Sequence, residues 1–124
     1  MLSNGIDLIE IERIEKALGH DGFCTRVYSP RELEELQSKR AESYAAAFCA
    51  KEAFSKAVGT GISGFSFVEV EVLHDERGKP YLSLSGRAKA IADEMNLGFA
   101  LSITHTREYA AAVVTAYTKE QNND

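Results

Sequence analysis

The spacing of the apolar residues changes once along this chain, at the glycine-rich stretch GTGISG, residues 59–64. Before this stretch, apolar side chains recur at the intervals of amphipathic helices. After it, FSFVEVEVLHD alternates from Phe67 to Val72, as a half-buried strand does. A chain of 124 residues with this order predicts an α+β fold, an antiparallel sheet packed against helices, rather than a doubly wound fold. We expect a single domain over residues 1–118 and a polar tail at 119–124.

Capping signals set the limits of three helices in the first half. The segment IEIERIEKAL predicts a helix that ends at Gly19. SPRELEEL begins with Ser29 as the N-cap and places Glu32 three residues later, which is the capping-box pattern. A third, alanine-rich helix is predicted from about Glu42 to Val58 and is closed by Gly59.

The strands come from both ends of the chain. Residues 3–8 predict a short first strand, and PYLSLS pairs with the alternating strand through the turn DERGKP. A fourth helix, GRAKAIADEMN, is expected to begin after Ser85 and to end at Gly98. FALSITHT and YAAAVVTAY then predict a last hairpin around Arg107 and Glu108.

The charge and the N-terminal residues exclude several classes of function. The formal net charge of −5 predicts a poor nonspecific binder of nucleic acid or of an anionic membrane, so neither is expected as a partner. Asp7, Glu10 and Glu12 lie where a signal peptide would need an apolar segment, which predicts a cytoplasmic protein. Cys24 and Cys49 lack the spacing of a zinc or redox motif, and we expect free thiols.

The helix end KEAFSKAVGTGI places charged groups beside a glycine loop. Glu52 and Lys56 are four residues apart, and Ser55 and Gly59 continue the same side of the helix. In an isolated EAFSK segment, a solvated Glu–Lys pair would be the favoured interpretation. The flanking alanines and phenylalanines indicate that this helix is mostly buried, and buried charges need partners or a ligand.

A second candidate is Asp7, between Ile6 and Leu8 at the end of the first strand. The segment alone leaves two alternatives equally open, a helix N-cap or a ligand. Asp7 and Glu52 together could hold Mg²⁺, which prefers hard oxygen ligands and usually takes one or two carboxylates. Two carboxylates beside lysines and a glycine loop make phosphoryl chemistry the leading hypothesis.

Five segments in order over almost the whole chain carry a resemblance to a known family: GIDLIEIERI, SPRE, KEAFSKAVGTGI, GKPYLSLSG and SITHTREYAAAVV. They closely resemble the holo-acyl-carrier-protein synthases, a branch of the 4′-phosphopantetheinyl transferases. The resemblance implies that fold, a Mg²⁺-dependent homotrimer and active sites at subunit interfaces. It also implies transfer of 4′-phosphopantetheine from coenzyme A to a serine of apo acyl carrier protein, with release of adenosine 3′,5′-bisphosphate, in fatty acid biosynthesis.

The resemblance also implies roles for individual residues. Asp7 and Glu52 become the metal ligands, and Lys56 joins them as a catalytic charge near the pyrophosphate. The residues implied in coenzyme A binding are Lys51, Ser55, Lys56, Gly59, Thr60, Gly61, Thr104, His105 and Thr106. Arg13 falls where the family contacts the acidic carrier protein, and Lys16 and Arg26 are expected to extend that patch. For Lys16, pairing with Glu12 or Glu15 in solvent is an equally good alternative.

One position departs from the family pattern. Ala47 stands where the family often has an arginine, so a contact to coenzyme A is lost or is supplied from elsewhere, for example by Arg40 or Arg107. Two alternatives to the transferase are a carrier-protein-binding module without turnover and a Mg²⁺-dependent hydrolase of coenzyme A or of a nucleotide pyrophosphate.

Overall fold

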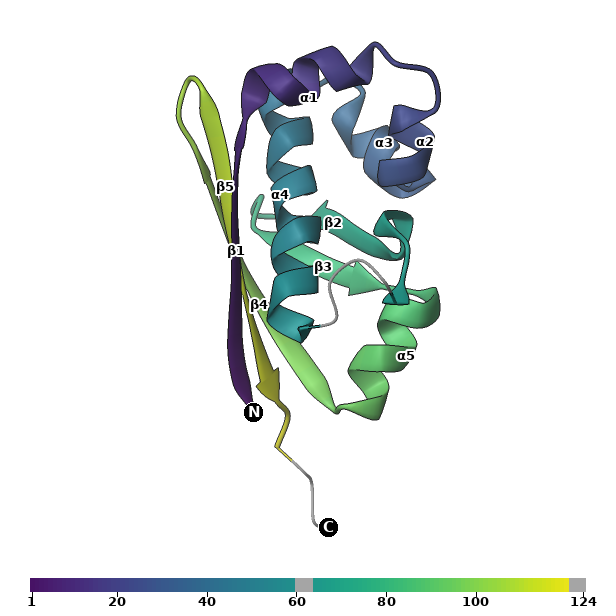
Figure 1. Ribbon diagram of the computed structural model, residues 1–124, viewed down its shortest axis with the longest axis vertical. Helices are drawn as coiled ribbons and strands as arrows, with labels where there is room; N and C mark the ends of the chain where they lie inside the picture. Colours follow the sequence, from purple (N-terminus) through teal and green to yellow (C-terminus); the bar gives the residue numbers. More distant parts are fainter. Residues whose placement is uncertain (60–63, 121–124) are drawn as a thin grey trace.

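A computed structural model describes residues 1–59 and 64–120 of the chain. Its main element is an antiparallel sheet in the order β1–β5–β4 (Figure 1), formed by β1 (Leu2–Glu10), β5 (Tyr109–Thr118) and β4 (Leu97–His105). The central strand therefore comes last in the chain. In this register Asp7 lies opposite Ala112 and His105 lies opposite Ala110.

The long helix α4 (Ala41–Val58) packs on one face of this sheet. Close packing is possible because small residues meet at the contact, including Ala53 and Ala57 on the helix and Ala112 on β5. Gly5 on β1 is essential to it, since a Cβ atom there would overlap the backbone of Ala53 and Ala57. This contact brings the middle of β1 against the C-terminal half of α4.

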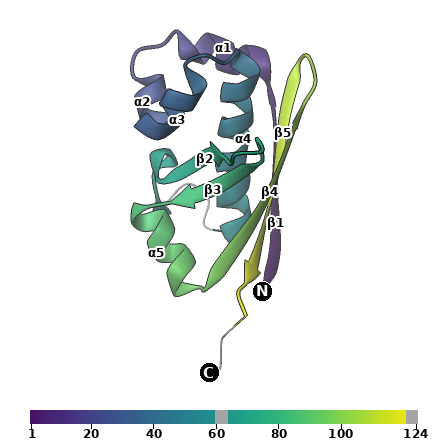
Figure 2. The ribbon, with the colours of Figure 1, turned by 180° about the vertical axis from the view of Figure 1, so that it is seen from behind.

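The other elements lie on the side of α4 that faces away from this sheet (Figures 1 and 2). Helices α1 (Ile11–Leu18), α2 (Phe23–Val27) and α3 (Pro30–Leu36) surround its N-terminal half. The hairpin of β2 (Val70–His74) and β3 (Pro80–Leu84), the short 3₁₀ helix η2 (Phe67–Glu69) and helix α5 (Gly86–Glu94) complete this layer. The buried apolar core lies between this layer, α4 and the sheet.

The opposite face of the sheet is bare within the described residues (Figures 1 and 2). Alternate residues of β1 point to that side, and Ile6 and Leu8 are 66% and 64% exposed. Tyr109 and Tyr117 of β5 pair with Glu10 and Leu2 and lie on the same face. The protein thus presents an apolar sheet surface, which we call the outer face, defined by Leu2, Ile6, Leu8, Tyr109, Val113 and Tyr117.

Several predicted features are confirmed. The fold is α+β with an antiparallel sheet, and Gly19 and Gly59 follow the last residues of α1 and α4. Ser29 and Glu32 form both hydrogen bonds of the capping box at the start of α3. Gly59 adopts a positive φ of 86°, the backbone conformation that glycine adopts most readily.

Other predictions are wrong. The alternating strand begins only at Val70. Glu71 is buried rather than solvated, and its carboxylate accepts a hydrogen bond from Ser29 Oγ and contacts Arg31. Ser85 makes no side-chain cap for α5; the Glu69 carboxylate accepts the amides of Arg87 and Ala88 instead. That helix also ends at Glu94 rather than at Gly98, and α2 was not predicted.

The part of the chain that the structure describes contains no helix with the length and apolarity needed to cross a membrane.

Candidate active site

A cavity of about 420 Å³ opens where β1, α1 and α4 meet. Asp7 reaches it from β1, Arg13 from α1, and Glu52 and Lys56 from α4. We call it the Asp7 cavity; its other lining residues are Leu8, Ile9, Ile14, Ala17, Phe23 and Phe48. The three residues predicted to be catalytic therefore share one hollow, although Asp7 is 45 positions before Glu52 in the chain.

Asp7 is not a helix cap. It lies inside β1, and Glu10 occupies the N-cap position of α1. Its carboxylate faces Lys56, whose Nζ lies 3.4 Å from Asp7 Oδ1 and donates to the carbonyl of Ile6 at 2.9 Å. Lys56 is 53% exposed, so its ammonium remains accessible from solvent. The structure removes the cap alternative and leaves the ligand alternative for Asp7.

The second carboxylate, Glu52, is in a less favourable electrostatic environment. Burial and the negative charge of Asp7 raise its pKa, and Lys56 opposes that rise only in part. Two close carboxylates whose negative charge is neutralised only in part by Lys56 favour a bound cation. Among the described residues no group of three or more His, Cys, Asp or Glu could hold a metal, so water or substrate oxygens would complete the ligands. The donor set therefore fits Mg²⁺.

We expect Glu52→Gln to stabilise the metal-free protein. The folded pKa of Glu52 lies above its unfolded value, so its charge costs stability at pH values above both. Removing the charge should raise the unfolding midpoint at pH 7.5 by about 2–4 °C. The difference from the unmodified protein should shrink as the pH falls through the folded pKa, where Glu52 becomes neutral.

Thermal unfolding in a chelator-containing buffer at several pH values measures this difference. Glu12→Gln, which removes an exposed carboxylate paired with Lys16, is the matched control. A lower midpoint for Glu52→Gln at pH 7.5 would mean that Glu52 stabilises the fold and that the site carries no excess negative charge.

Cys49 lies about one helical turn before Glu52 on α4. Its thiol is buried and donates to the carbonyl of Ala110 at 3.4 Å. Burial, followed by the nearby charge of Asp7, raises its pKa to about 12. The thiol therefore stays protonated and unreactive in this position.

Two predicted coenzyme A contacts are contradicted by burial. Lys51 is 0% exposed, and its Nζ donates to Glu32 Oε1 and to the carbonyls of Phe67 and Val70 at 2.7–2.9 Å. An ammonium has three donors, and these partners use all of them. Ser55 is 2% exposed and likewise offers no surface hydroxyl. The resemblance implied that both residues contact coenzyme A, but both side chains are buried in the single chain.

Of the other predicted coenzyme A residues, Lys56 lines the Asp7 cavity, whereas Gly59, Thr104, His105 and Thr106 are not among its lining residues. Thr60 and Gly61 lie outside the described residues, and Gly59 ends α4. His105 lines another hollow, of about 680 Å³, together with Lys39, His74 and Ala47; we call it the His105 cavity.

The three predicted residues of the last hairpin do not act as one group. Thr104 pairs with Ala111 and faces the outer side of the sheet, whereas His105 pairs with the buried Ala110 on the inner side. Thr106 lies in the turn, where its Oγ1 accepts the amide of Tyr109. One chain therefore does not bring these three residues to Asp7.

The predicted carrier-protein residues divide into two kinds. Arg13 lines the Asp7 cavity, and Arg26 lines an adjoining apolar hollow. This hollow is the Phe67 groove, lined by Phe23, Thr25, Arg26, Val27, Phe48, Ser66, Phe67 and Val68. Lys16 pairs instead with Glu12 at 3.3 Å in solvent, as the alternative interpretation had it.

Sequence reasoning missed the aromatic residues between these hollows. Phe23 and Phe48 line both the Asp7 cavity and the Phe67 groove. A signal existed for Phe48, because it precedes Glu52 by four residues and so lies on the same side of α4. Nothing in the local pattern of Phe23 indicated its position, because α2 itself was not predicted.

Comparisons with known proteins agree over nearly the whole chain. The family model described as the 4′-phosphopantetheinyl transferase superfamily matches residues 3–114. A protein of Fusobacterium nucleatum named holo-[acyl-carrier-protein] synthase is 46% identical over 113 residues, which are 88% of this chain and 93% of that protein.

Solved structures are similar as well. A holo-(acyl-carrier-protein) synthase from Bacillus anthracis in complex with CoA (3′,5′-ADP) has a TM-score of 0.80 and 40% identity, covering 94% of this chain and 96% of that one. A complex of ACPS with CoA from Chronobacterium ammoniagenes has a TM-score of 0.85 and 32% identity, covering 97% and 99%.

Proposed function

The chain belongs to the 4′-phosphopantetheinyl transferase superfamily, and from this premise we infer that it acts as a holo-[acyl-carrier-protein] synthase. It transfers 4′-phosphopantetheine from coenzyme A to a serine of apo acyl carrier protein. The serine hydroxyl releases its proton and its oxygen forms a bond to phosphorus, the phosphoanhydride bond of coenzyme A breaks, and adenosine 3′,5′-bisphosphate leaves. The observation that carries this function is the convergence of Asp7, Glu52 and Lys56 in one cavity.

The proposed roles follow from the chemistry of these three side chains. Asp7 and Glu52 would hold Mg²⁺, which when bound withdraws electron density from a pyrophosphate and stabilises negative charge on its oxygens. Lys56, fixed to the carbonyl of Ile6 but accessible, is placed to neutralise charge on the oxygen that departs. Arg13, on the α1 side of the same cavity, orients the incoming protein.

Product analysis tests the reaction directly. Chromatography should detect adenosine 3′,5′-bisphosphate only when coenzyme A, Mg²⁺ and apo carrier protein are all present. Release of the bisphosphate without carrier protein would indicate the hydrolase instead.

We propose that Arg13 attracts the carrier protein. The chain carries a formal charge of −5, so an acidic partner is repelled at long range and needs a local cation at the cavity. Arg13→Glu should raise the KM for carrier protein by at least about tenfold at low salt and weaken its salt dependence. The KM for coenzyme A should hardly change.

Steady-state kinetics at two ionic strengths measure both constants. Lys89→Glu makes the same charge change on the exposed surface of α5 and serves as the control. Equal increases in the KM for carrier protein in the two variants would assign the effect to net charge rather than to Arg13.

We also propose a homotrimer with active sites between subunits. The apolar outer face is suited to a second copy of the chain, because a large exposed apolar surface marks an interaction site. A further support is that His105 and Asp7 line separate cavities in one chain, so residues from two copies would be needed to join them.

The cellular setting completes the proposal. We propose fatty acid biosynthesis as the pathway that the modified carrier protein serves. We also propose the cytoplasm as the location, where unpaired cysteines such as Cys24 and Cys49 stay reduced.

A further inference from the structure

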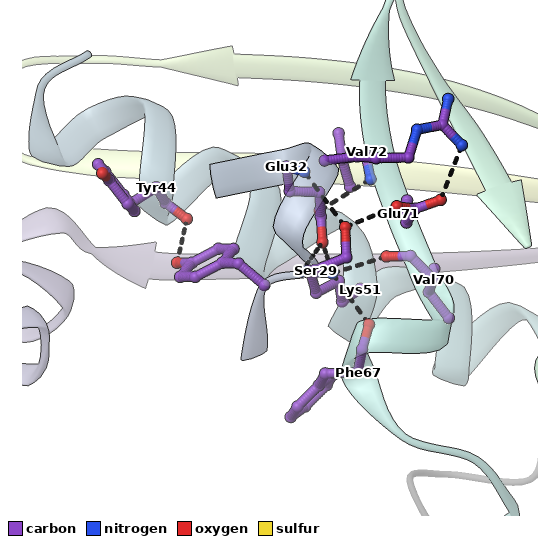
Figure 3. Close-up of polar contacts among 10 residues, drawn as sticks. Ser29, Glu32, Tyr44, Lys51, Phe67, Val70, Glu71 and Val72 are labelled. Carbon is purple, nitrogen blue, oxygen red and sulfur yellow. Dashed lines mark hydrogen bonds and ion pairs between the residues drawn. The ribbon is translucent and has the colours of Figure 1, made fainter. Parts of the chain in front are cut away.

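A buried polar network joins α3, α4, η2 and β2 (Figure 3). At its centre the ammonium of Lys51 meets the carboxylate of Glu32, with Nζ and Oε1 2.7 Å apart and both side chains fully buried. Ser29 and Glu71 extend the network toward the surface, where Arg31 reaches Glu71 Oε1 at 3.4 Å. We call the central contact the Lys51–Glu32 pair.

The network is fully satisfied at its centre. Glu32 Oε1 accepts from Lys51 and from the amide of Ser29, and Oε2 accepts from the amide of Val72 at 2.8 Å. Lys51 also donates to the carbonyls of Phe67 and Val70. Four elements from two parts of the chain, α3 with α4 and η2 with β2, are thus tied to a single ammonium and a single carboxylate (Figure 3).

Stability alone does not explain a pair in this place. Burial lowers the pKa of Lys51, and the attraction of Glu32 opposes that effect. Buried ion pairs are often no more stabilising than well-packed apolar residues of similar volume, because removing two charges from water is costly. A role in fixing geometry is the alternative that this arrangement favours.

Phe67 connects the Lys51–Glu32 pair to the active site. With its carbonyl held by Lys51, Phe67 places its ring 5.7 Å from the ring of Phe48, measured between centroids. Phe48 in turn stacks on Phe23 at 6.4 Å. Phe23, Phe48 and Phe67 form an aromatic row, which starts in the Phe67 groove and ends at the Asp7 cavity.

The aromatic row lies between the two cations proposed to meet the carrier protein. Arg13 lines the hollow at one end of the row and Arg26 the hollow at the other. A partner that contacts both cations would cover the row. A displaced Phe67 would therefore change how that partner is seated while leaving Asp7, Glu52 and Lys56 in place on β1 and α4.

We propose that the buried Lys51–Glu32 pair is a positioning device that holds Phe67 and the aromatic row in the shape that receives the carrier protein. Lys51 is thus a positioning residue that acts through Phe67 and touches no substrate. The functional part of this inference rests on the proposed transferase activity.

The test compares Lys51→Met with the double variant Lys51→Met/Glu32→Gln. The single variant leaves an unpaired buried carboxylate and is expected to lose much of its stability, whereas the double variant removes both charges. In the double variant the carbonyls of Phe67 and Val70 still lack their donor. Lys89→Met, which removes the lysine of an exposed pair on α5, is the control.

Amide hydrogen exchange provides the first measurement and needs no substrate. The amides of Glu69 and Val70, which donate to Ser66 and Phe67, should exchange at least about tenfold faster in the double variant. Amides that join β1 and β5 should exchange at their original rates. Unchanged exchange at Glu69 and Val70 would overturn the positioning role, whether or not the protein is a transferase.

Steady-state kinetics provide the second measurement, at a temperature where every variant is folded. The double variant should raise the KM for carrier protein by at least about fivefold and change kcat by less than about twofold. Combining it with Phe67→Ala, which keeps the backbone carbonyl but removes the ring, should add no further increase in KM. A purely structural pair would instead leave the KM of the folded double variant unchanged.

The two hypotheses fail in different ways. Absence of transfer by the unmodified protein and by Lys89→Met would contradict the proposed function. Normal transfer combined with an unchanged KM in the double variant would overturn the inference about Lys51. If the Lys51→Met/Glu32→Gln substitutions raised the KM for carrier protein as much in a Phe67→Ala protein as in the unmodified protein, Lys51 would not act through the Phe67 ring.

Discussion

Asp7→Asn should reduce turnover by about 10²–10⁴-fold while leaving the fold intact. The substitution keeps the size of the side chain but removes one of the two negative ligands offered to a hard cation. Lys56 would still donate to the carbonyl of Ile6, so the contact of β1 with α4 should persist. Glu52→Gln should cause a loss of similar size for the same reason, despite its predicted gain in stability.

Rates measured over a range of Mg²⁺ concentrations test this prediction. Additional Mg²⁺ should restore part of the lost rate, since a weakened site fills at higher metal concentration. Glu12→Gln, an exposed carboxylate variant on α1, should behave like the unmodified protein. Turnover near the original value for Asp7→Asn at limiting Mg²⁺ would mean that Asp7 is only a surface carboxylate.

Ile6→Glu should abolish assembly and with it at least about 99% of the activity. Ile6 lies in the centre of β1 on the outer face, where it is 66% exposed in a single chain. A carboxylate there costs a lone chain little, but it would be buried without a partner if a second copy covered the face. Loss of the assembly would separate the Asp7 cavity of one chain from the His105 cavity of another.

Light scattering and turnover on the same sample measure the two consequences together. Met95→Glu places the same charge on an exposed apolar residue after α5, away from the outer face, and should keep both assembly and activity. A monomeric Ile6→Glu variant with full activity would contradict the interfacial site. A fully assembled variant would show that the outer face is not the interface.

The predictability of the fold from sequence depended on how local the signals were. The capping box at Ser29 and the glycine after α4 are local backbone signals, and the structure has both where they were expected. The prediction of an exposed Glu71 was wrong because alternation of apolar and polar residues assumes that one face of the strand is solvated. In the folded protein α3 covers that face, and Ser29 and Arg31 supply partners for the carboxylate.

The candidate site was predictable in part for a similar reason. The four-residue spacing of Glu52 and Lys56 fixes their common side of α4 without any knowledge of the rest of the fold. The coenzyme A role of Lys51 came from the resemblance, and no local pattern argued against it, because its buried partner Glu32 comes from another helix. One signal was present: Glu32 precedes the apolar Leu36 by four residues and therefore lies on the buried side of α3.

The contact of Asp7 with α4 could not be predicted from local sequence patterns. It depends on Gly5, whose missing side chain allows the strand to approach the backbone of Ala53 and Ala57. The glycine was visible in the sequence, but nothing there named the helix that would approach it. Spacing could not pair Asp7 with Glu52; the chemistry of two carboxylates suggested the pair as a Mg²⁺ site, and the resemblance to a known family implied the same pair.

The mass of an apo carrier protein after incubation tests the central claim most directly. With this protein, coenzyme A and Mg²⁺, we expect the carrier protein to gain the mass of one phosphopantetheine, attached to a single serine. The gain should be absent without coenzyme A and greatly reduced with Asp7→Asn. An unchanged carrier-protein mass with the folded, unmodified protein would contradict the account and would favour a binding module that lacks turnover.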